Sequence, residues 1–417
     1  MTIRTTALAA LLSGTALAAQ AAAPADVVSN YADIALAGYE DSLETAKALK
    51  AALETLVAEP TDANLDAAKA AWIAARVPYQ QTEAFRFGNP VVDDWEGKVN
   101  AWPLDEGLID YVEGDAGLND ENPFSGANVI ANPSLEVSGA TVDATAITPE
   151  LLQEMHEIDG IEANVTTGYH AIEFLLWGQD LNGTDAGAGM RPVTDFDAAN
   201  CTGGNCERRA EYLLAAADLL ISDLEDAVAL WAEGGQGRAD VTADPVQGLV
   251  MAFTGMGSLS YGEQAGERMQ LGLLLHDPEE EHDCFSDNTH ASHFYDGQGI
   301  QNVYTGTYTR VDGSMVEGPS LYDVVKEKDA DLADALKADI EMTMEKLGAI
   351  VAQAEAGTAY DQLIGAGNDE GNAIVQAAID ALVAQTRNIE RAVAAVGLDP
   401  IAVEGSDSLD NPDAVFE

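Results

Sequence analysis

Residues 207–232 read ERRAEYLLAAADLLISDLEDAVALWA, and this stretch indicates the class of fold. Its apolar side chains recur at steps of three and four residues, at Leu213, Ala217, Leu220, Leu224, Ala227 and Trp231. That spacing places them in one stripe along an α-helix, so that one face is buried and the opposite face meets water. The stretch therefore predicts an amphipathic helix that packs in a bundle.

Similar patterns extend over most of the chain. Ala- and Leu-rich segments with interleaved charges predict further helices at 28–58, 61–87, 148–158, 165–178, 245–272, 329–355 and 372–396. Pro60 separates the first two, and the sequence Gly-Asn-Pro at 88–90 ends the second. Because strong strand alternation is absent from the sequence, we expect an all-α protein made of helical bundles.

Long irregular stretches separate the predicted helices. Residues 89–146, 179–205 and 277–320 are rich in Gly, Asn, Pro and Asp, and loops of this length are functional or disordered. The acidic tail at 401–417 is expected to fray. EAFRFG at 83–88 and ERMQLG at 267–272 both end a predicted long helix. This similarity is either chance or the trace of an internal duplication whose halves join near 195–206, with ligand sites favoured in the cleft between them.

The charge balance narrows the range of partners. The chain has 72 acidic and 19 basic side chains among 417 residues, which gives a formal net charge of −53. Such a charge repels phosphate groups, so it argues against a nucleic-acid partner and against adhesion to anionic lipid. Cations are the natural small partners. The alternative is that the acidity only keeps the protein solvated, as in proteins from salty water.

The N-terminus resembles an export signal. Residues 1–21 combine Arg4 with an apolar stretch at 5–18 and small-x-small cleavage patterns at 16–18 and 19–21. No cysteine follows the apolar stretch, so a lipoprotein anchor is not indicated, and no later segment offers about 20 uninterrupted apolar residues for a membrane span. We therefore expect a periplasmic or secreted protein.

The three cysteines fit this compartment. Cys201 and Cys206 flank a flexible Thr-Gly-Gly-Asn loop, which predicts a small disulfide in an oxidising environment. A metal site is the alternative for this pair, although no second cysteine pair accompanies it. Cys284 is then expected to be a buried thiol.

The clearest candidate for chemistry is a histidine three residues before a glutamate. His170 and Glu173 share one face of a predicted helix, so their side chains can converge on one cation, and this pair of ligands suits zinc or iron. The alternative is a buried histidine that simply pairs with the glutamate. The motifs of zincin peptidases, serine hydrolases, P-loop enzymes and c-type haem proteins are absent from the sequence.

Other acidic residues and histidines offer further ligands. Residues 279–293 read EEEHDCFSDNTHASH and supply acids, imidazoles and a thiol within a short span, although a solvated acidic loop is the alternative. Glu263 and Glu267 lie four apart on a predicted helix, where like charges repel unless a cation or Arg268 lies between them. Glu83 can be a ligand or only the ion-pair partner of Arg86.

Several blocks of the sequence resemble a known protein family. Residues 168–173, GYHAIE, match the GxHxxE signature of the imelysin family, whose members are also called insulin-cleaving metalloproteinase-like or iron-regulated protein A-like. Further blocks are similar over residues 30–395: Trp72, Arg76, Tyr79, Glu83 and Arg86 with Phe-Gly, then VNAWP at 99–103, GERM at 266–269 and CFSDNTH at 284–290.

The resemblance implies a particular architecture and role. It implies an exported bacterial protein of two four-helix-bundle-like halves, at 28–200 and 207–397, with the signature at or near the cleft between them. Members of this family are tied to iron uptake and periplasmic iron binding, and the founding members were described as metallopeptidases. Catalytic zinc usually needs three protein ligands, and the signature supplies two. We therefore expect metal binding, with a metallopeptidase and a binding module for a peptide or an iron chelate as the alternatives.

The expected site follows from this resemblance. His170 and Glu173 are predicted to hold iron or another divalent metal such as zinc, and Gly168 to allow close approach of the backbone or helix packing. Four more residues are candidates to complete or orient the site: Glu83, Glu263, Glu267 and His290. The expected partners are the metal ion and other periplasmic iron-uptake proteins.

Overall fold

The computed structural model describes residues 22–114, 122–137 and 139–416, so the predicted signal peptide at 1–21 lies outside the described residues. Helices make up 66% of the structure and strands 4%, which confirms the all-α prediction. The strands form two antiparallel hairpins, β1 (Ser134–Val137) with β2 (Ala140–Asp143) and β3 (Thr307–Thr309) with β4 (Met315–Glu317). Within the described part of the chain, no helix is long and apolar enough to cross a membrane.

A first bundle forms around α1 (Pro24–Ala58), which packs against α2 (Asp62–Gln80) and α7 (Cys206–Trp231). α6 (Gly168–Trp177) packs on both α2 and α7. Fully buried Trp72 and Trp231 contribute large apolar surfaces to its core. The ends of the helices follow local signals, since Pro24 begins α1 and the Thr61 side chain accepts a hydrogen bond from Asn64 N at the start of α2. Four shorter helices complete this part: α3 (Pro90–Asn100), α4 (Glu106–Ile109), α5 (Pro149–Met155) and α8 (Gln236–Ala243).

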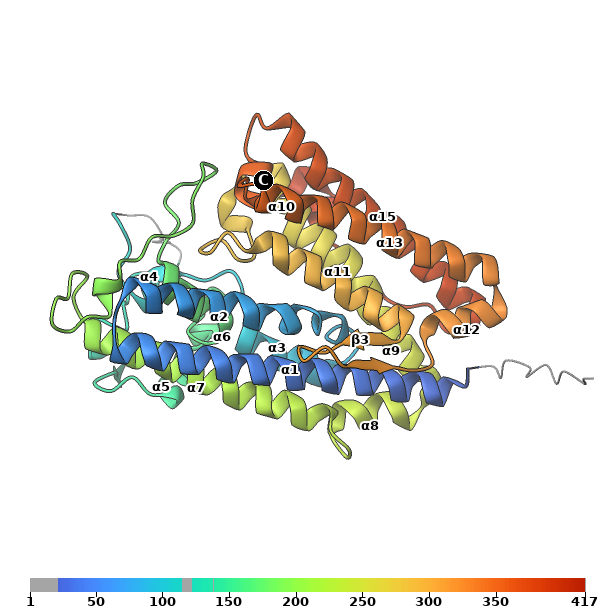
Figure 1. The fold of residues 1–417 in the computed structure, drawn as a ribbon, viewed down its shortest axis with the longest axis horizontal. Coiled ribbons are helices and arrows are strands. Elements are labelled where there is room, and N and C mark those ends of the chain that lie inside the picture. The colour runs from blue at the N-terminus through green and yellow to red at the C-terminus, as the bar shows by residue number, and fades with distance from the viewer. Residues whose placement is uncertain (1–21, 115–121, 138, 417) are drawn as a thin grey trace, which may run out of the picture.

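A second bundle lies beside the first, above it in the view of Figure 1. It contains α11 (Thr289–Thr305), α13 (Ala330–Glu355) and α15 (Asp369–Val396), which pack together with a π-helix, η4 (Leu259–Gln270). The shorter α12 (Leu321–Lys328) and α14 (Tyr360–Ile364) join these helices. A separate apolar cluster packs between η4, α13, α14 and α15 inside this bundle.

One long helical segment links the two bundles. α9 (Pro245–Ser258) packs on α1, continues into η4, and ends in α10 (Leu271–Leu275) without an intervening loop. The predicted helix at 245–272 is therefore continuous, but its middle has the wider π geometry. The π geometry brings residues that are five positions apart onto the same face of the helix. Arg268 Nε accordingly donates to Glu263 Oε1, five residues earlier, at 2.8 Å.

The division between the halves differs from the predicted one at 200–207. α7 and α8 lie after that point, yet α7 is a central member of the first bundle and α8 packs on α1 and α7. The stripe in α7 predicts correctly that one face is buried, but it carries no information about which helix covers that face. Among the described residues, the α9–η4 segment carries the chain from the first bundle into the second.

Two of the stretches predicted as irregular contain helices. α3 lies within 89–146, and the 17-residue α11 lies within 277–320. α11 has little apolar periodicity because its neighbours come too close for large side chains. A Cβ at Gly297 would lie 2.6 Å from Leu347 Cδ1, and one at Gly299 would lie 2.6 Å from the carbonyl oxygen of Gln81. Small residues therefore make this helix possible while hiding its pattern.

The acidic tail packs on the second bundle, contrary to the expectation that it frays. It forms α16 (Asp407–Asp410) and a 3₁₀ turn, η6 (Pro412–Phe416). Ser408 Oγ donates to the carbonyl oxygen of Gly266 at 2.9 Å, and Tyr261 donates to Asp410 Oδ1 at 2.7 Å. Gly266 leaves the space that the buried Ser406 occupies.

The stretch at 179–205 is irregular, as predicted, and two features hold it in place. Cys201 and Cys206 form a disulfide at the start of α7, whereas Cys284 is a buried free thiol. The second feature is a buried ion-pair cluster, in which Asp110 accepts hydrogen bonds from Arg191 Nη1 at 2.7 Å and from Arg209 Nε at 2.6 Å. Because Arg191 belongs to the stretch and Arg209 to α7, Asp110 joins three separate segments of the chain.

Candidate metal centre

The signature lies on α6, and every residue of this helix is buried. Gly168 begins the helix with φ +79°, a conformation that strains any residue with a Cβ. A Cβ at this position would lie 2.3 Å from the carbonyl oxygen of Val99, near the end of α3. The structure thus contains the close backbone approach expected at Gly168, and that approach sets the position of His170 two residues later.

We expect Gly168→Ala to lower the free energy of unfolding by about 2–5 kcal/mol, since it adds a positive-φ penalty to a collision with fixed backbone. Gly160→Ala is the matched control. Gly160 also has positive φ, at +70°, but nothing lies within 4 Å of the added Cβ, so a loss of only about 1–2 kcal/mol is expected. Urea denaturation followed by circular dichroism measures both. Equal losses in the two variants would contradict the packing role of Gly168.

The pair at the centre of the signature is held in a fixed orientation. His170 Nδ1 lies 3.0 Å from Glu173 Oε2, and both side chains are buried. Glu173 Oε1 accepts hydrogen bonds from Ser286 N at 3.0 Å and from Ser286 Oγ at 2.6 Å. Histidine ligands of metals typically give their second nitrogen to a carboxylate in this way. Glu173 is thus placed to orient His170, and His170 Nε2 is left buried without a hydrogen-bond partner.

A second segment of the chain brings two more donors to this point. Ligand atoms of His170, His282 and Asp283 all lie within 4.8 Å of one another, and all three residues are buried. Ring centroids of His170 and His282 are 4.9 Å apart. Two imidazoles and one carboxylate make up a donor set that is typical of non-haem iron and is also compatible with zinc. We call these three residues the triad.

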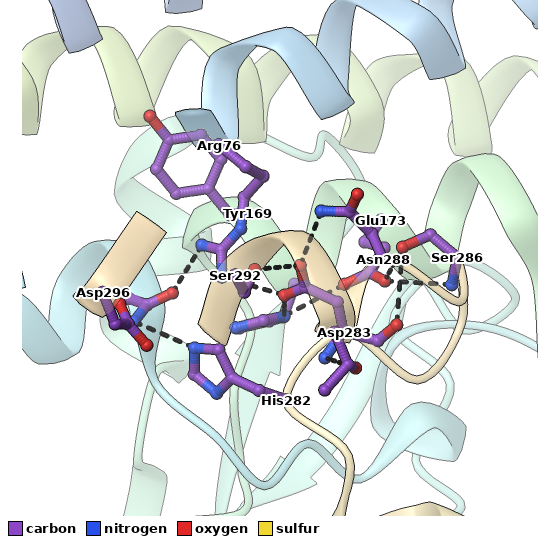
Figure 2. A network of polar contacts seen from close by, with 12 residues as sticks. Arg76, Tyr169, Glu173, His282, Asp283, Ser286, Asn288, Ser292 and Asp296 are labelled. Atoms are coloured by element: carbon purple, nitrogen blue, oxygen red, sulfur yellow. Dashed lines mark hydrogen bonds and ion pairs between the residues drawn. The ribbon is translucent and has the colours of Figure 1, made fainter. Parts of the chain in front are cut away.

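The triad carboxylate belongs to a network that spans both bundles (Figure 2). Arg76 of α2 donates from Nη2 to Asp283 Oδ1 at 2.8 Å and from Nη1 to Asn100 Oδ1 at 2.6 Å. Asn100 Nδ2 in turn lies 3.3 Å from His282 Nε2. Asp283 Oδ2 accepts hydrogen bonds from Ser292 Oγ and, at 2.9 Å, from Asn288 Nδ2. The carboxylate is therefore fixed in place before any ligand arrives.

Burial controls the protonation of these groups. It lowers the pKa of His170 to about 3 and holds the pKa of His282 well below its ordinary value, so both imidazoles are neutral at pH 7. Burial, together with the nearby Asp283, raises the pKa of Glu173. Burial also opposes ionisation of Asp283, but the Arg76 guanidinium holds the pKa of this carboxyl below its usual range. Neutral imidazoles beside an ionised carboxylate are the forms that coordinate metal.

The other candidate ligands lie elsewhere. Glu83 and Glu263 both bind Arg268, with oxygen–nitrogen distances of 2.7 Å, rather than joining the triad. Glu267 is exposed on η4. His290 is the second residue of α11, and its Nδ1 lies 3.0 Å from the carbonyl oxygen of Asp287. Sequence reasoning missed His282 and Asp283 as specific ligands, although both lie within the predicted constellation at 279–293.

A cleft of about 460 Å³ opens beside the triad. Its walls come from α3 and the loops around 101–103 and 157–162 on one side, and from η4, α10 and His282 on the other. Six glutamates line it, against two arginines: Glu96, Glu157, Glu162, Glu263, Glu267 and Glu280, with Arg86 and Arg268. An acidic cleft raises the local concentration of cations, and His282 belongs both to its wall and to the triad.

Comparisons with known proteins agree with this architecture. Residues 35–389 match the family model described as imelysin. A 57-residue segment is 44% identical to iron-regulated protein A of Synechococcus elongatus. The matched segment spans 14% of this chain and 16% of that relative. A putative iron-regulated protein A precursor from Parabacteroides distasonis has the same fold, with a TM-score of 0.63 at 19% identity over 89% of this chain and 95% of its own. An imelysin-like protein from Psychrobacter arcticum has a TM-score of 0.57 at 18% identity, over 90% of this chain and 96% of its own.

The family match covers most of the chain, and the matched region contains the signature, the triad and both bundles. The two solved structures share the fold over nearly their whole length. The chain belongs to the imelysin family.

Proposed function

We propose that this protein is an exported metal-binding protein that works in iron uptake or iron handling, and that its triad holds the ion. The observation that carries the proposal is His170 Nε2, a buried nitrogen without a partner beside a second imidazole and an ionised carboxylate. An isolated polar atom in the interior costs free energy, so its retention favours a ligand-binding role.

The geometry of the triad fits a single ion after a small adjustment. Metal–ligand bonds are about 2.0–2.2 Å long, so donors on opposite sides of one ion are at most about 4.4 Å apart. The triad atoms lie within 4.8 Å of one another, so movements of a few tenths of an ångström are sufficient. Arg76 already occupies one side of Asp283 Oδ1, and the ion would share this oxygen.

Iron is preferred to other metals for two reasons. A set of two histidines and one carboxylate suits ferrous iron. Two of the similar proteins carry the name iron-regulated protein A or its putative precursor. Export to the periplasm or to the medium rests on the signal pattern at 1–21, and it would place the protein among other iron-uptake proteins of that compartment. The glutamates of the cleft would attract the cation, and His282 would link the cleft to the triad.

The proposal is tested by metal content and by proton release. Burial and the nearby Asp283 raise the pKa of Glu173 and so favour its protonated form, whereas a metal on His170 Nε2 requires the imidazole proton on Nδ1 and an ionised Glu173 facing it. Binding should therefore release up to about one proton per ion, and affinity should rise with pH. Calorimetry with ferrous, ferric and zinc ions in two buffers of different ionisation enthalpy measures this. Saturable binding without proton release would place the ion elsewhere.

A metallopeptidase is the second candidate, because the structure offers a third donor that the signature lacks. Catalytic zinc sites use three protein ligands beside an open position, and the triad adjoins a cleft large enough for a short peptide. The test is cleavage of a fluorogenic protein substrate by the zinc-loaded protein, compared with His170→Ala treated in the same way. Among the described residues that line the cleft, Trp102 is the one Trp, Tyr or Phe, so an aromatic chelate pocket is less favoured.

A further inference from the structure

A second, smaller cavity has different lining residues from the cleft, and the segment around His282 and Asp283 contributes residues to both. Its volume is about 10 Å³, which is room for one water molecule or one ion. Four carboxylates line it: Glu106 of α4, Asp180 of the loop after α6, and Glu279 and Glu281 at the 3₁₀ turn η5 (Pro278–Glu280). Cys284 and Phe285 complete one wall.

The charges around this cavity are not balanced by protein groups. Among the described residues, the lining contains no lysine, arginine or histidine. The hydrogen-bond donors that these carboxylates have are neutral, with Gln179 Nε2 donating to Glu106 Oε2 at 3.1 Å and Asn182 N to Asp180 Oδ1 at 2.9 Å. Burial and mutual repulsion raise the pKa of Glu106 to about 7. Glu106 and Glu281 are buried, and buried like charges without a counterion are costly, so this group needs a cation or protons.

Glu281 provides an independent sign of a ligand. Its side chain is 1% exposed, and its Oε2 has no hydrogen-bond partner. Burial and then the equally buried Asp361 of α14 raise the pKa of Glu281, whereas a hydrogen bond with the Thr289 side chain lowers it. For Asp361 itself, the groups that favour the charge are backbone amides of its own helical turn. In contrast to the Arg268 cluster, where a guanidinium holds Glu83 and Glu263, this group has no basic partner to explain its burial.

We propose that the cavity is a second cation site, which binds one Ca²⁺ ion through the carboxylates of Glu106, Asp180, Glu279 and Glu281. Oxygen ligands from flexible segments are what Ca²⁺ prefers, and it accepts six to eight of them at about 2.3–2.6 Å. Burial, followed by the surrounding acids, raises the pKa of the Cys284 thiol, so this group stays protonated and does not compete for a softer metal. The exposed Glu279 provides access from solvent.

The four carboxylates are more open than a loaded site and would have to move together when the ion enters. In the described part of the chain, only the triad brings three possible ligand atoms within 4.8 Å of one another. The four carboxylates therefore stand further apart than in a loaded site, as repelling groups do, and a divalent cation would draw them together. Three of the four lie on loops or a 3₁₀ turn, which move more easily than helices.

The position of the site gives the ion a structural role. It would tie α4 and the loop after α6, which belong to the first bundle, to η5, which belongs to the second. Residues 282 and 283 follow Glu281 directly, so the ion would also fix the segment that supplies two of the three triad residues. This site is separate from the proposed iron site and does not depend on it.

The experiment is a calcium titration of the mature protein after treatment with a chelator, in about 0.15 M salt to screen diffuse binding to the acidic surface. Calorimetry should show saturable binding of CaCl₂, and Ca²⁺ should raise the melting temperature, because it binds the folded state alone. Glu281→Gln should weaken the affinity for Ca²⁺ at least tenfold and abolish the rise in melting temperature. Without Ca²⁺, this variant should melt at the same temperature as the wild type or higher, because it removes a repelling charge.

Three further variants make the outcome decisive. Glu106→Gln, on the opposite wall, should show the same loss, so a folding defect in one variant leaves the test intact. Glu211→Gln, on the exposed face of α7, removes one charge and should bind Ca²⁺ like the wild type. His170→Ala should also retain Ca²⁺ binding. No saturable binding, equal affinity in Glu281→Gln and Glu211→Gln, or a loss in His170→Ala would each overturn the proposal.

Discussion

Replacing His170 with alanine is expected to weaken iron binding at least tenfold while leaving the helical circular dichroism spectrum unchanged. The substitution removes the buried Nε2 that the proposed ion would use, and even residues that only orient ligands typically contribute a factor of about 10–100 to metal affinity. Asp283→Asn should show a comparable loss, because it replaces the charged ligand by a neutral one. Calorimetric titration beside a thermal melt of each variant separates lost affinity from lost stability.

His290→Ala is the informative control for this prediction. The sequence suggested His290 as a ligand, whereas the structure places its Nδ1 against the carbonyl oxygen of Asp287. We therefore expect His290→Ala to bind iron like the wild type. If His170→Ala also bound iron like the wild type, the triad would not be the metal site. The alternative function, binding of a peptide or an iron chelate, would then be favoured.

The largest expected effect on stability comes from Asp110→Asn, which should lower the free energy of unfolding by about 3–5 kcal/mol. Asp110 is 2% exposed and accepts hydrogen bonds from both Arg191 and Arg209, whose guanidinium groups are buried as well. Losing its charge leaves two buried cations with Asp195 as their remaining carboxylate. The arginines also hold the pKa of Asp110 below its ordinary value against the effect of burial, so this contribution is present at neutral pH and disappears on acidification through that lowered pKa.

A surface pair offers the matched comparison. Asp218 makes an ion pair with Lys50, but its side chain is 49% exposed. Exposed pairs of this kind contribute about 0–1 kcal/mol, so Asp218→Asn should have little effect. Urea denaturation of both variants measures the difference. A similar small loss in Asp110→Asn would mean that the buried cluster does not hold the 179–205 stretch in place.

The sequence predicts helices well where apolar spacing is regular and poorly where close packing replaces large side chains. α7 is predicted within one residue of its observed ends, because its stripe is uninterrupted. α11 is missed, because Gly297 and Gly299 allow contacts that leave no apolar stripe to detect. The partner of each stripe is a long-range property, so the assignment of α7 to the first bundle is not visible in its own residues.

The same limit applies to the site. His170 and Glu173 can be paired from sequence because a helix fixes side chains that are three residues apart. The distinction between their roles depends on Ser286, which lies 113 residues away from Glu173 and holds its Oε1. Likewise, the selection of His282 and Asp283 from the constellation at 279–293 depends on Arg76 and Asn100, which are contributed by α2 and α3. These contacts exist only after the bundles have packed.

The uninterrupted α9–η4–α10 segment determines how the molecule can respond mechanically to a ligand. It is one continuous helical segment that joins both bundles. A hinge motion between the bundles at this crossing would therefore have to bend a helix. Under the proposed function, capture of a cation near η4 would therefore rely on side-chain rearrangement inside a stiff frame, unlike the clamshell closure of binding proteins whose lobes are joined only by loops. If the protein binds a metal as proposed, this stiffness would favour selectivity, because the frame would resist adapting to a cation of the wrong size.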